Sequence, residues 1–536
     1  MKRPPAGLLA AAIAAAATLY TGALQAQPAM PYANATDRAA AGVFEARAHD
    51  WRNGAVVYQV FVDRYAPPAD LQAKRALYPP PKVLHPWDDL PRAGHYVDSA
   101  HVWSHEIDFW GGDLKSLQGR LDYVQGLGAD VLYLNPIDLA YTNHKYDTQD
   151  YKAVSPEYGT RDDVKALAAD LHRRGMKLVL DGVFNHMGRS SPLFRQAEAD
   201  PASPYRDWFY FGPQYPGGAR AWAQAQSLPE LNLENPAVRA YLWGDPDSVV
   251  RGWLRDGIDG WRLDVAFDIG FRFLGELTAA AHAQKPGSLV LGEIANYPQE
   301  WFPSVDGVLG FTLRHIILGL AQGRIDTATG GRMIARLVRD AGIEPMLKSW
   351  IYLGNHDTER LATVLPDEAE RRLAQVLQFT LPGSPNLYYG DELGMTGGAD
   401  PAMRAPMRWD RVRDDNPALT WTKQLIALHR ASRALRVGDF RLAVANRLFA
   451  FERRTDRAGE SVIVLVNAAA EPVQETVMLT DSKLMDGTRL VDLLGAHAPL
   501  RIASSMLDVS LPAHGFLVLR PDLTPQGGYS NYKRVQ

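Results

Sequence analysis

Eight short β-rich runs alternate with helical stretches along most of the chain, and this alternation limits the fold more than any other feature. The first run, residues 55–62, is β-branched and aromatic, and residues 114–127 follow it with the Leu and Val spacing of a helix. Strand–helix alternation predicts an α/β fold with a parallel sheet, and eight units predict a closed (β/α)8 barrel, the TIM-barrel architecture. The other predicted strands are residues 131–135, 177–183, 260–263, 288–294, about 308–313, 350–353 and 386–389.

Two regions do not follow this alternation. Residues 187–250 are rich in Pro, Gly and aromatic residues and have little periodicity, which predicts an inserted loop domain after the third strand. After a helix at residues 422–434, β-rich runs separated by turn residues predict a C-terminal antiparallel β-sandwich domain. The expected division is a signal peptide at 1–26, an N-terminal lead-in at 27–54, the barrel at 55–436, the β-domain at 437–522 and a disordered tail at 523–536.

The first residues have the pattern of an export signal. Lys2 and Arg3 precede an Ala- and Leu-rich stretch at residues 7–24, and Ala26 is a small residue at the expected cleavage point. An uncleaved membrane anchor is the alternative, but the stretch is only weakly hydrophobic. We therefore expect an exported protein, periplasmic or extracellular, without a membrane segment after cleavage.

Bulk composition removes several classes of function. The chain has no cysteine, which excludes disulfides, thiolate catalysis and Cys-ligated zinc. Its formal net charge is −4 and no basic patch stands out, so we expect no nucleic-acid partner.

Polar side chains gather where four of the predicted strands end. A single Asp after a strand is most often a helix cap or a turn residue. Four strands that deliver carboxylates or imidazoles to the same rim of a barrel are typical of an active site, because barrel enzymes build their sites at the carboxyl ends of the strands. These residues are Asp181, Asn185 and His186 after strand three, Arg262 and Asp264 at strand four, Glu293 at strand five, and Asn355, His356 and Asp357 after strand seven.

This set of residues suits glycoside cleavage with retention of configuration. One carboxylate attacks the anomeric carbon and a protonated carboxyl group about 5 Å away donates to the departing oxygen. The acid needs a raised pKa, whereas the nucleophile must stay ionised. Arg262 lies two residues before Asp264 and so shares its face of the strand, where a cation would keep the carboxylate ionised.

The same segments resemble the four signature regions of the α-amylase family, glycoside hydrolase family 13. They are, in order, residues 181–186 (Asp-Gly-Val-Phe-Asn-His), 260–266 (Gly-Trp-Arg-Leu-Asp-Val-Ala), 292–293 (Gly-Glu) and 355–357 (Asn-His-Asp). The resemblance covers residues 56–520. Within the family, residues 144–151, 228–232 and 355–360 resemble most the neopullulanase, cyclomaltodextrinase and maltogenic amylase group.

The resemblance assigns a catalytic role to three carboxyl residues. It implies that Asp264 is the nucleophile, that Glu293 is the general acid/base, and that Asp357 grips sugar hydroxyls and favours a distorted ring. It also implies that Arg262 is one of the substrate-binding residues and that Asp181 braces Arg262.

The resemblance also identifies residues that bind the sugar at the cleavage point. His186 and His356 would bond to it, and Tyr146 would form the aromatic platform beneath it. The implied activity is that of a retaining glycosidase acting on α-1,4-linked glucans or maltooligosaccharides. A glucanotransferase remains an alternative, as does an exo-acting α-glucosidase, because residues 404–410 resemble a segment of those enzymes.

The sequence leaves a structural calcium ion open and predicts no organic cofactor. Asn185 matches a calcium ligand of the family, and residues 111–113 (Gly-Gly-Asp) resemble half of another site. The loop after Tyr65 is Pro-rich and lacks the usual partner ligands, so a full set of oxygen donors cannot be assembled.

Overall fold

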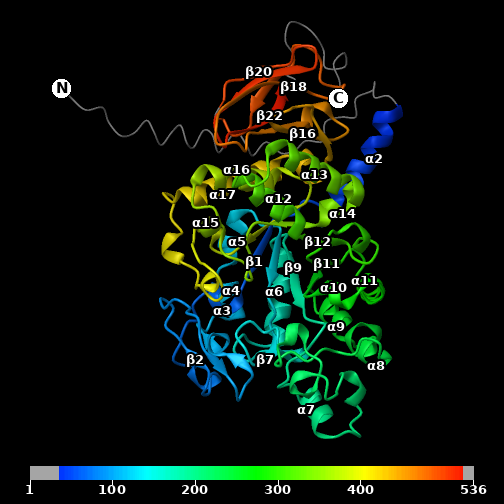
Figure 1. The fold of residues 1–536 in the computed structure, drawn as a ribbon, viewed down its shortest axis with the longest axis vertical. Helices are drawn as coiled ribbons and strands as arrows, with labels where there is room; N and C mark the ends of the chain where they lie inside the picture. Colours follow the sequence, from blue (N-terminus) through cyan, green and yellow to red (C-terminus); the bar gives the residue numbers. More distant parts are fainter. Residues whose placement is uncertain (1–34, 496, 523–536) are drawn as a thin grey trace, which may run out of the picture.

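The computed structural model describes residues 35–495 and 497–522, so the predicted signal peptide and tail lie outside the described residues. Eight parallel strands close into a barrel, each hydrogen-bonded to the next and the last to the first (Figure 1). The predicted (β/α)8 barrel is confirmed. In ring order the strands are β1 (Val57–Val60), β6 (Val131–Leu134), β9 (Lys177–Gly182), β10 (Gly260–Leu263), β11 (Leu289–Ile294), β12 (Gly307–Gly310), β13 (Trp350–Tyr352) and β14 (Ser384–Tyr388).

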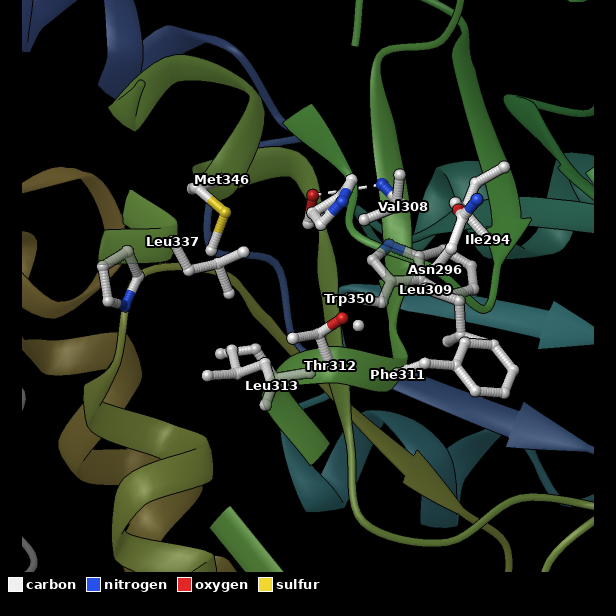
Figure 2. A pocket seen from close by; sticks show the side chains of 15 residues that line it. Ile294, Asn296, Val308, Leu309, Phe311, Thr312, Leu313, Leu337, Met346 and Trp350 are labelled. Carbon is white, nitrogen blue, oxygen red and sulfur yellow. Dashed lines mark hydrogen bonds between the residues drawn. The ribbon is translucent and has the colours of Figure 1, made fainter. Parts of the chain in front are cut away.

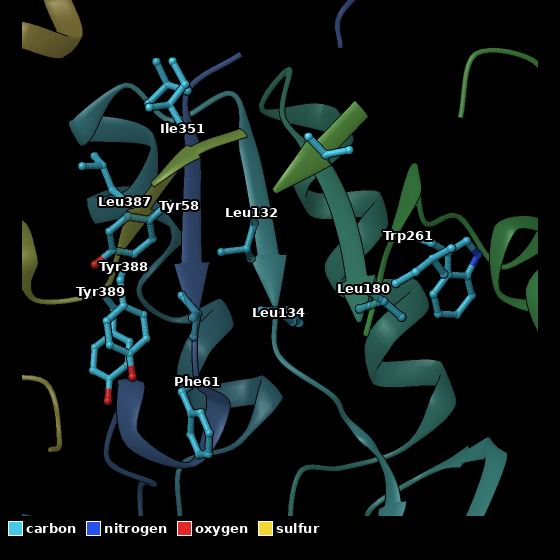
Figure 3. Close-up of a cluster of buried hydrophobic side chains, with 14 of the residues drawn as sticks. Tyr58, Phe61, Leu132, Leu134, Leu180, Trp261, Ile351, Leu387, Tyr388 and Tyr389 are labelled. Atoms are coloured by element: carbon cyan, nitrogen blue, oxygen red, sulfur yellow. The ribbon is translucent and has the colours of Figure 1, made fainter. Parts of the chain in front are cut away.

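Successive residues on each strand face opposite sides of the barrel wall. Val57 packs in an inner cluster with Tyr133 and Trp350, whereas the adjacent Tyr58 belongs to the larger cluster between the barrel and its helices. Figure 3 shows this larger cluster, with Leu132 among its members. Bulky inner side chains fill the barrel, which leaves only its rim for a ligand.

Helices cover the outside of the barrel, and their sequences show why they form. Helix α6 (Arg161–Arg173) begins at Thr160, which accepts a hydrogen bond from the amide of Asp163, and it buries Val164, Leu167 and Leu171 on one face. The other helices that follow strands include α9 (Val249–Arg255), α11 (Phe271–Gln284), α12 (Phe311–Ala321), α13 (Thr327–Ala341), α16 (Glu368–Thr380) and α17 (Pro417–Ala431).

Two predicted boundaries were wrong. The sixth strand was expected to reach residue 313, but β12 ends at Gly310 and α12 begins at once. Leu313, Ile316, Ile317 and Leu320 are buried, which is helical spacing, so an apolar run was read as too long a strand. The helix expected at 114–127 is divided into α4 (Leu114–Gln118) and α5 (Leu121–Leu127).

Two long excursions rise from the carboxyl ends of the strands. Residues 66–113 follow β1 and contain two small sheets, one pairing β2 (Val83–Leu84) with β5 (Asp108–Phe109) and one pairing β3 (Tyr96–Val97) with β4 (Val102–Trp103). Residues 187–250 follow β9 and hold helix α7 (Pro192–Ala199) and isolated bridges such as that between Phe209 and Leu231. Both excursions therefore lie on the face where the site residues were predicted.

The expected lead-in contains a helix that the sequence pattern does not indicate. Helix α2 spans Ala35–His49, and Phe44 and Arg47 are its buried residues within 41–49. Arg47 donates hydrogen bonds to Glu344 and Asp439, which attach the helix to the barrel and to the C-terminal domain. One buried apolar residue is too weak a pattern to predict a helix. None of the described helices combines the length and apolar character that crossing a bilayer requires.

The C-terminal domain is antiparallel, as predicted. A six-stranded sheet and the two-stranded sheet β18–β21 enclose an apolar core that includes Ile463, Val477 and Leu519. The six-stranded sheet has the order β15 (Asp439–Leu442), β16 (Phe449–Arg454), β17 (Val462–Val466), β22 (Phe516–Asp522), β19 (Arg489–Asp492) and β20 (Leu500–Arg501); the second sheet joins β18 (Val473–Met478) and β21 (Met506–Leu511).

Arg453 connects this domain to the barrel, and replacing it should destabilise the protein. Its fully buried guanidinium donates to the carbonyl oxygens of Thr380 in α16 and Gly438, and burial lowers the pKa of Arg453 to about 9. We expect Arg453→Met to leave both carbonyls unsatisfied and to lower the free energy of unfolding by about 2–4 kcal/mol, measured by denaturant titration. Met at the exposed Arg441 of β15 is the control, and equal stability of the two variants would contradict the role of Arg453.

Candidate active site

One guanidinium lies among three carboxylates at the rim of the barrel. Arg262 and Asp181 are direct neighbours in the register of β10 and β9, and Nη1 of Arg262 donates to both oxygens of Asp181, at 2.8 and 3.0 Å. The same Nη1 lies 3.2 Å from Asp264, and Nη2 lies 2.9 Å from Glu293. The side chain of Arg262 is 1% exposed, so a buried, charged fork connects strands β9, β10 and β11.

A strained turn follows Asp264 and points toward Glu293. Val265 has φ 46° and ψ 39°, a left-handed conformation that a β-branched residue rarely adopts. Its amide donates to Oε2 of Glu293 at 3.0 Å. The strained conformation therefore places a hydrogen-bond donor against a carboxylate, and such strain is common at functional sites.

Asp264 and Glu293 are neighbouring carboxyl groups around Arg262. Burial, and then the charge of Glu293, raise the pKa of Asp264 well above its ordinary value, while Arg262 acts in the opposite direction. Burial and a nearby like charge therefore both favour the protonated form of Asp264. One protonated and one ionised carboxyl group is the combination that acid-assisted displacement needs.

Asp357 lies on the same rim but is open to solvent. Its side chain is 44% exposed, Nε2 of His356 lies 3.0 Å from it, and Arg404 donates to it at 3.2 Å. The partial burial of its carboxyl group would raise the pKa of Asp357. The charges of His356 and then Arg404 act more strongly and hold this pKa well below its ordinary value. The result is an ionised, accessible acceptor for hydroxyl groups.

Tyr146 and His356 form a stacked pair beside these carboxylates. Their ring centroids are 5.4 Å apart at an interplanar angle of 11°. The hydroxyl of Tyr146 donates to Asp181 at 3.0 Å and lies 2.5 Å from Nε2 of His356. Tyr133, inside the barrel, donates to Asp181 at 2.6 Å. Asp181 thus joins Arg262 to the aromatic side of the site.

His186 faces the insertion after β9. Its ring stacks on Trp222 with centroids 5.6 Å apart, and its Nε2 is buried without a hydrogen-bond partner among the described residues. Burial lowers the pKa of His186 to about 3, so the ring is neutral at physiological pH. A neutral imidazole with an unused nitrogen can bond to a hydroxyl group of a ligand.

Several residues that contact the predicted set were not predicted themselves. Glu106, in the excursion after β1, lies 3.3 Å from Nε2 of His144, whose ring stacks on Tyr146 at 5.7 Å. Trp222 comes from the insertion and Arg404 from the loop after β14. Arg404 lay in a segment noted for its resemblance, but Glu106 and Trp222 come from aperiodic loops whose positions depend on tertiary contacts.

A small apolar cavity beneath the rim is not part of this site. It lies between β11–β13 and helices α12 and α13, and Leu313, Leu337 and Met346 contribute to its lining (Figure 2). Its volume of about 20 Å³ is room for roughly one water molecule, too little for a sugar ring. None of the rim carboxylates lines it.

The residues that suggested calcium do not fit a metal ion in this structure. Lys74 donates to the carbonyl of Gly111 and to the carboxylate of Asp113, so an ammonium group already uses these oxygens. The amide nitrogen of Asn185 faces Nδ1 of His186 at 3.5 Å. In residues 35–495 and 497–522, no three His, Cys, Asp or Glu side chains group in a way that could hold a metal.

Comparison with known proteins identifies the family. The family model "Alpha amylase, catalytic domain" matches residues 59–451. The chain belongs to the α-amylase family. It is 34% identical over 470 residues to neopullulanase 2 of Thermoactinomyces vulgaris, a match that covers 83% of this chain and 75% of that protein. It is 33% identical to a cyclomaltodextrinase of Geobacillus thermopakistaniensis, with 88% and 78% covered.

Solved structures of the α-amylase family have the same fold. The ligand-free cyclic α-maltosyl-(1→6)-maltose hydrolase of Arthrobacter globiformis superposes with a TM-score of 0.73 at 30% identity, covering 88% of this chain and 99% of that one. The matched family segment contains the whole rim from Tyr146 to Arg404. The resemblance to the neopullulanase and cyclomaltodextrinase group is confirmed by these relatives.

The pKa of His186 predicts how stability depends on pH. The folded pKa, about 3, is below the ordinary 6.5, so the neutral ring stabilises the fold above about pH 6.5 and this stability is lost as the pH falls toward 3. Between pH 6 and pH 4, we expect the unfolding free energy of the His186→Gln variant to fall less than that of the wild type. The difference should be about 1.4 kcal/mol per pH unit. Denaturant titrations at both pH values measure the difference, and identical slopes for the variant and the wild type would contradict it.

Proposed function

We propose that this protein is a retaining glycosidase that hydrolyses α-1,4-linked glucans or maltooligosaccharides. The observation that carries the proposal is the single guanidinium of Arg262 shared by Asp264 and Glu293. It supports a short separation between the two carboxyl groups, which retention requires and which leaves no room for an inverting water. Four relatives, including the two described above, are a neopullulanase and three cyclomaltodextrinases, all hydrolases, which favours hydrolysis over glucan transfer.

In the proposed reaction, Asp264 attacks the anomeric carbon and Glu293 gives its proton to the departing oxygen. Arg262 favours the ionised form of Asp264 against the effects of burial and of the charge of Glu293, and the amide of Val265 orients Glu293. The bond from the sugar to the leaving oxygen breaks as the bond to Asp264 forms. Glu293, now ionised, then takes a proton from water, which releases the sugar with its α-configuration retained.

The remaining rim residues bind the sugar at the cleavage point. Asp357 is ionised and open to solvent, so it can accept hydrogen bonds from two adjacent hydroxyl groups. His186 offers a free ring nitrogen, and His356 is held by Gln59 on its other nitrogen. Tyr146 supplies an aromatic face on which a sugar can stack.

Export is a proposal that rests on the sequence alone. Residues 1–26 have the charge and apolar pattern of a signal peptide. An absence of cysteine is compatible with either side of the membrane, so the leader pattern is the argument for a periplasmic or extracellular enzyme.

Product profiles test the reaction and separate it from its alternatives. Purified protein is incubated with maltotriose, maltoheptaose, β-cyclodextrin and pullulan. We expect shorter sugars with new reducing ends that are α-anomers when first formed, detected by NMR. The activity of Asp264→Asn should be more than about a hundredfold lower than that of the wild type. Asp268→Asn, at an exposed position, is the control and should keep the wild-type activity. New β-anomers would exclude retention, chains longer than the substrate would indicate a glucanotransferase, and glucose as the first product from maltoheptaose would indicate an exo-acting α-glucosidase.

Glu293→Gln tests the acid/base role apart from binding. The variant should nearly lose hydrolysis of maltooligosaccharides but form the glycosyl-enzyme from an α-glucosyl fluoride, because fluoride departs without a proton. Azide needs no general base, so it should accelerate the second step and give an α-glycosyl azide. Glu300→Gln, at an exposed position in the segment that follows β11, is the control. Equal loss on both substrates without azide rescue would make Glu293 a positioning residue.

A further inference from the structure

Lys74 lies in a cluster of oxygen atoms of the kind that binds a hard cation. Its Nζ donates to the carbonyl of Gly111 at 2.7 Å, to Oδ2 of Asp113 at 2.9 Å and to the carbonyl of Glu157 at 2.7 Å. An ammonium group has three N–H donors, so all of them are used. Two carbonyls and a carboxylate are also typical calcium ligands.

The three oxygens come from segments that are far apart in the sequence. Gly111 and Asp113 precede helix α4, and Asp113 also caps that helix by accepting from the amide of Ser116 at 2.7 Å. Glu157 lies between β8 (Thr148–Val154) and α6. Lys74 is in the excursion after β1, with its side chain 12% exposed. The ammonium therefore joins the early part of the excursion to its end, before α4, and to the loop between β8 and α6.

Two further ammonium groups surround the same cluster. Lys82 and Lys145 each lie 3.1 Å from the carboxylate of Glu157, and both are within about 5 Å of the ring centre of Phe109. Burial would raise the pKa of Glu157, but Lys145 and Lys82 lower it to about 2. Two other carboxylates have partners of their own: Asp63 is paired with Arg64, and Asp147, whose charge also acts on Lys145, accepts from the amides of Tyr141 and Thr142.

While Lys74 is present, the charges in the cluster oppose the binding of a divalent ion. Three ammonium groups face the carboxylates of Asp113 and Glu157, so these five groups carry a net positive charge before any metal is added. A calcium ion would have to displace Lys74 from its oxygens and would then be repelled by all three ammonium groups, whereas removal of the Lys74 side chain would vacate the oxygens and lower the positive charge by one. In a partly buried site, such like-charge repulsion is screened little by water.

We propose that Lys74 takes the place of a bound calcium ion at this junction, so that the protein holds the wall of its site without a divalent metal. The wall matters because the excursion that Lys74 secures also carries Glu106. Glu106 lies 3.3 Å from His144, and the ring of His144 stacks on Tyr146. An internal cation keeps this arrangement independent of the calcium supply around the protein.

Thermal unfolding of the wild-type enzyme tests the proposal without any substitution. Melting temperatures are measured in EDTA and in millimolar CaCl2, with isothermal titration of calcium in parallel. We expect the same melting temperature in both buffers and no heat of stoichiometric calcium binding. A melting temperature that falls in EDTA and returns with calcium would overturn the proposal.

Substitutions at Lys74 test whether its ammonium group stabilises the junction. Lys74→Ala should melt several degrees lower than the wild type in EDTA, because three oxygens lose their donor. Lys115→Ala, an exposed lysine in α4, is the matched control and should melt with the wild type. Calcium should recover part of the loss in Lys74→Ala, where space opens beside the oxygens, and none in Lys74→Met, where the side chain fills that space.

Two outcomes of the substitution series would overturn the proposal. One is a wild-type melting temperature for Lys74→Ala in EDTA, because the ammonium would then contribute nothing to the junction. The other is equal recovery of Lys74→Ala and Lys74→Met in calcium, because the ion would then bind elsewhere. Both readouts are independent of catalysis, so they hold whatever reaction the enzyme proves to perform.

Discussion

Arg262 places one buried positive charge against Asp181, Asp264 and Glu293, and the rest of the site is arranged around it. Three carboxyl groups so close together at this depth repel one another when ionised, and a cation among them offsets this repulsion. The guanidinium offers two nitrogens on a rigid fork, so it fixes directions as well as charge. Its own burial is tolerable because it is surrounded by anions, which raise the pKa of Arg262 well above its ordinary value.

The barrel makes this arrangement possible through strand register. Arg262 and Asp181 are paired on neighbouring strands, and their side chains leave the wall on the same face. Tyr133, Trp350 and other bulky side chains fill the interior below them, so the polar groups gather at the rim. The loops then add what the strands cannot supply, such as the amide of Val265 and the ring of Trp222.

The wall of excursions relies on a second use of buried positive charge. Lys74 donates three hydrogen bonds, to Gly111 and Asp113 at the end of the excursion after β1 and to Glu157 in the loop between β8 and α6. An ammonium on a flexible side chain and a metal ion satisfy the same oxygens, but the lysine is part of the chain and cannot be removed by a chelator. The catalytic rim and its supporting wall therefore both depend on cations supplied by side chains.

The sequence by itself determined the barrel, the β-domain and the short segments that carry Asp264, Glu293 and Asp357. Strand–helix alternation is a local signal, and residues at strand ends keep their place whatever the loops do. Only the tertiary structure decided that α12 begins where a strand was expected to continue, that Glu106 and Trp222 reach the site, and that Lys74 fills an oxygen cluster. The start of α12 was missed because a short apolar run fits a strand as well as a buried helix. The positions of Glu106, Trp222 and Lys74 depend on contacts between residues distant in the chain, and their segments have no periodicity from which such contacts could be predicted.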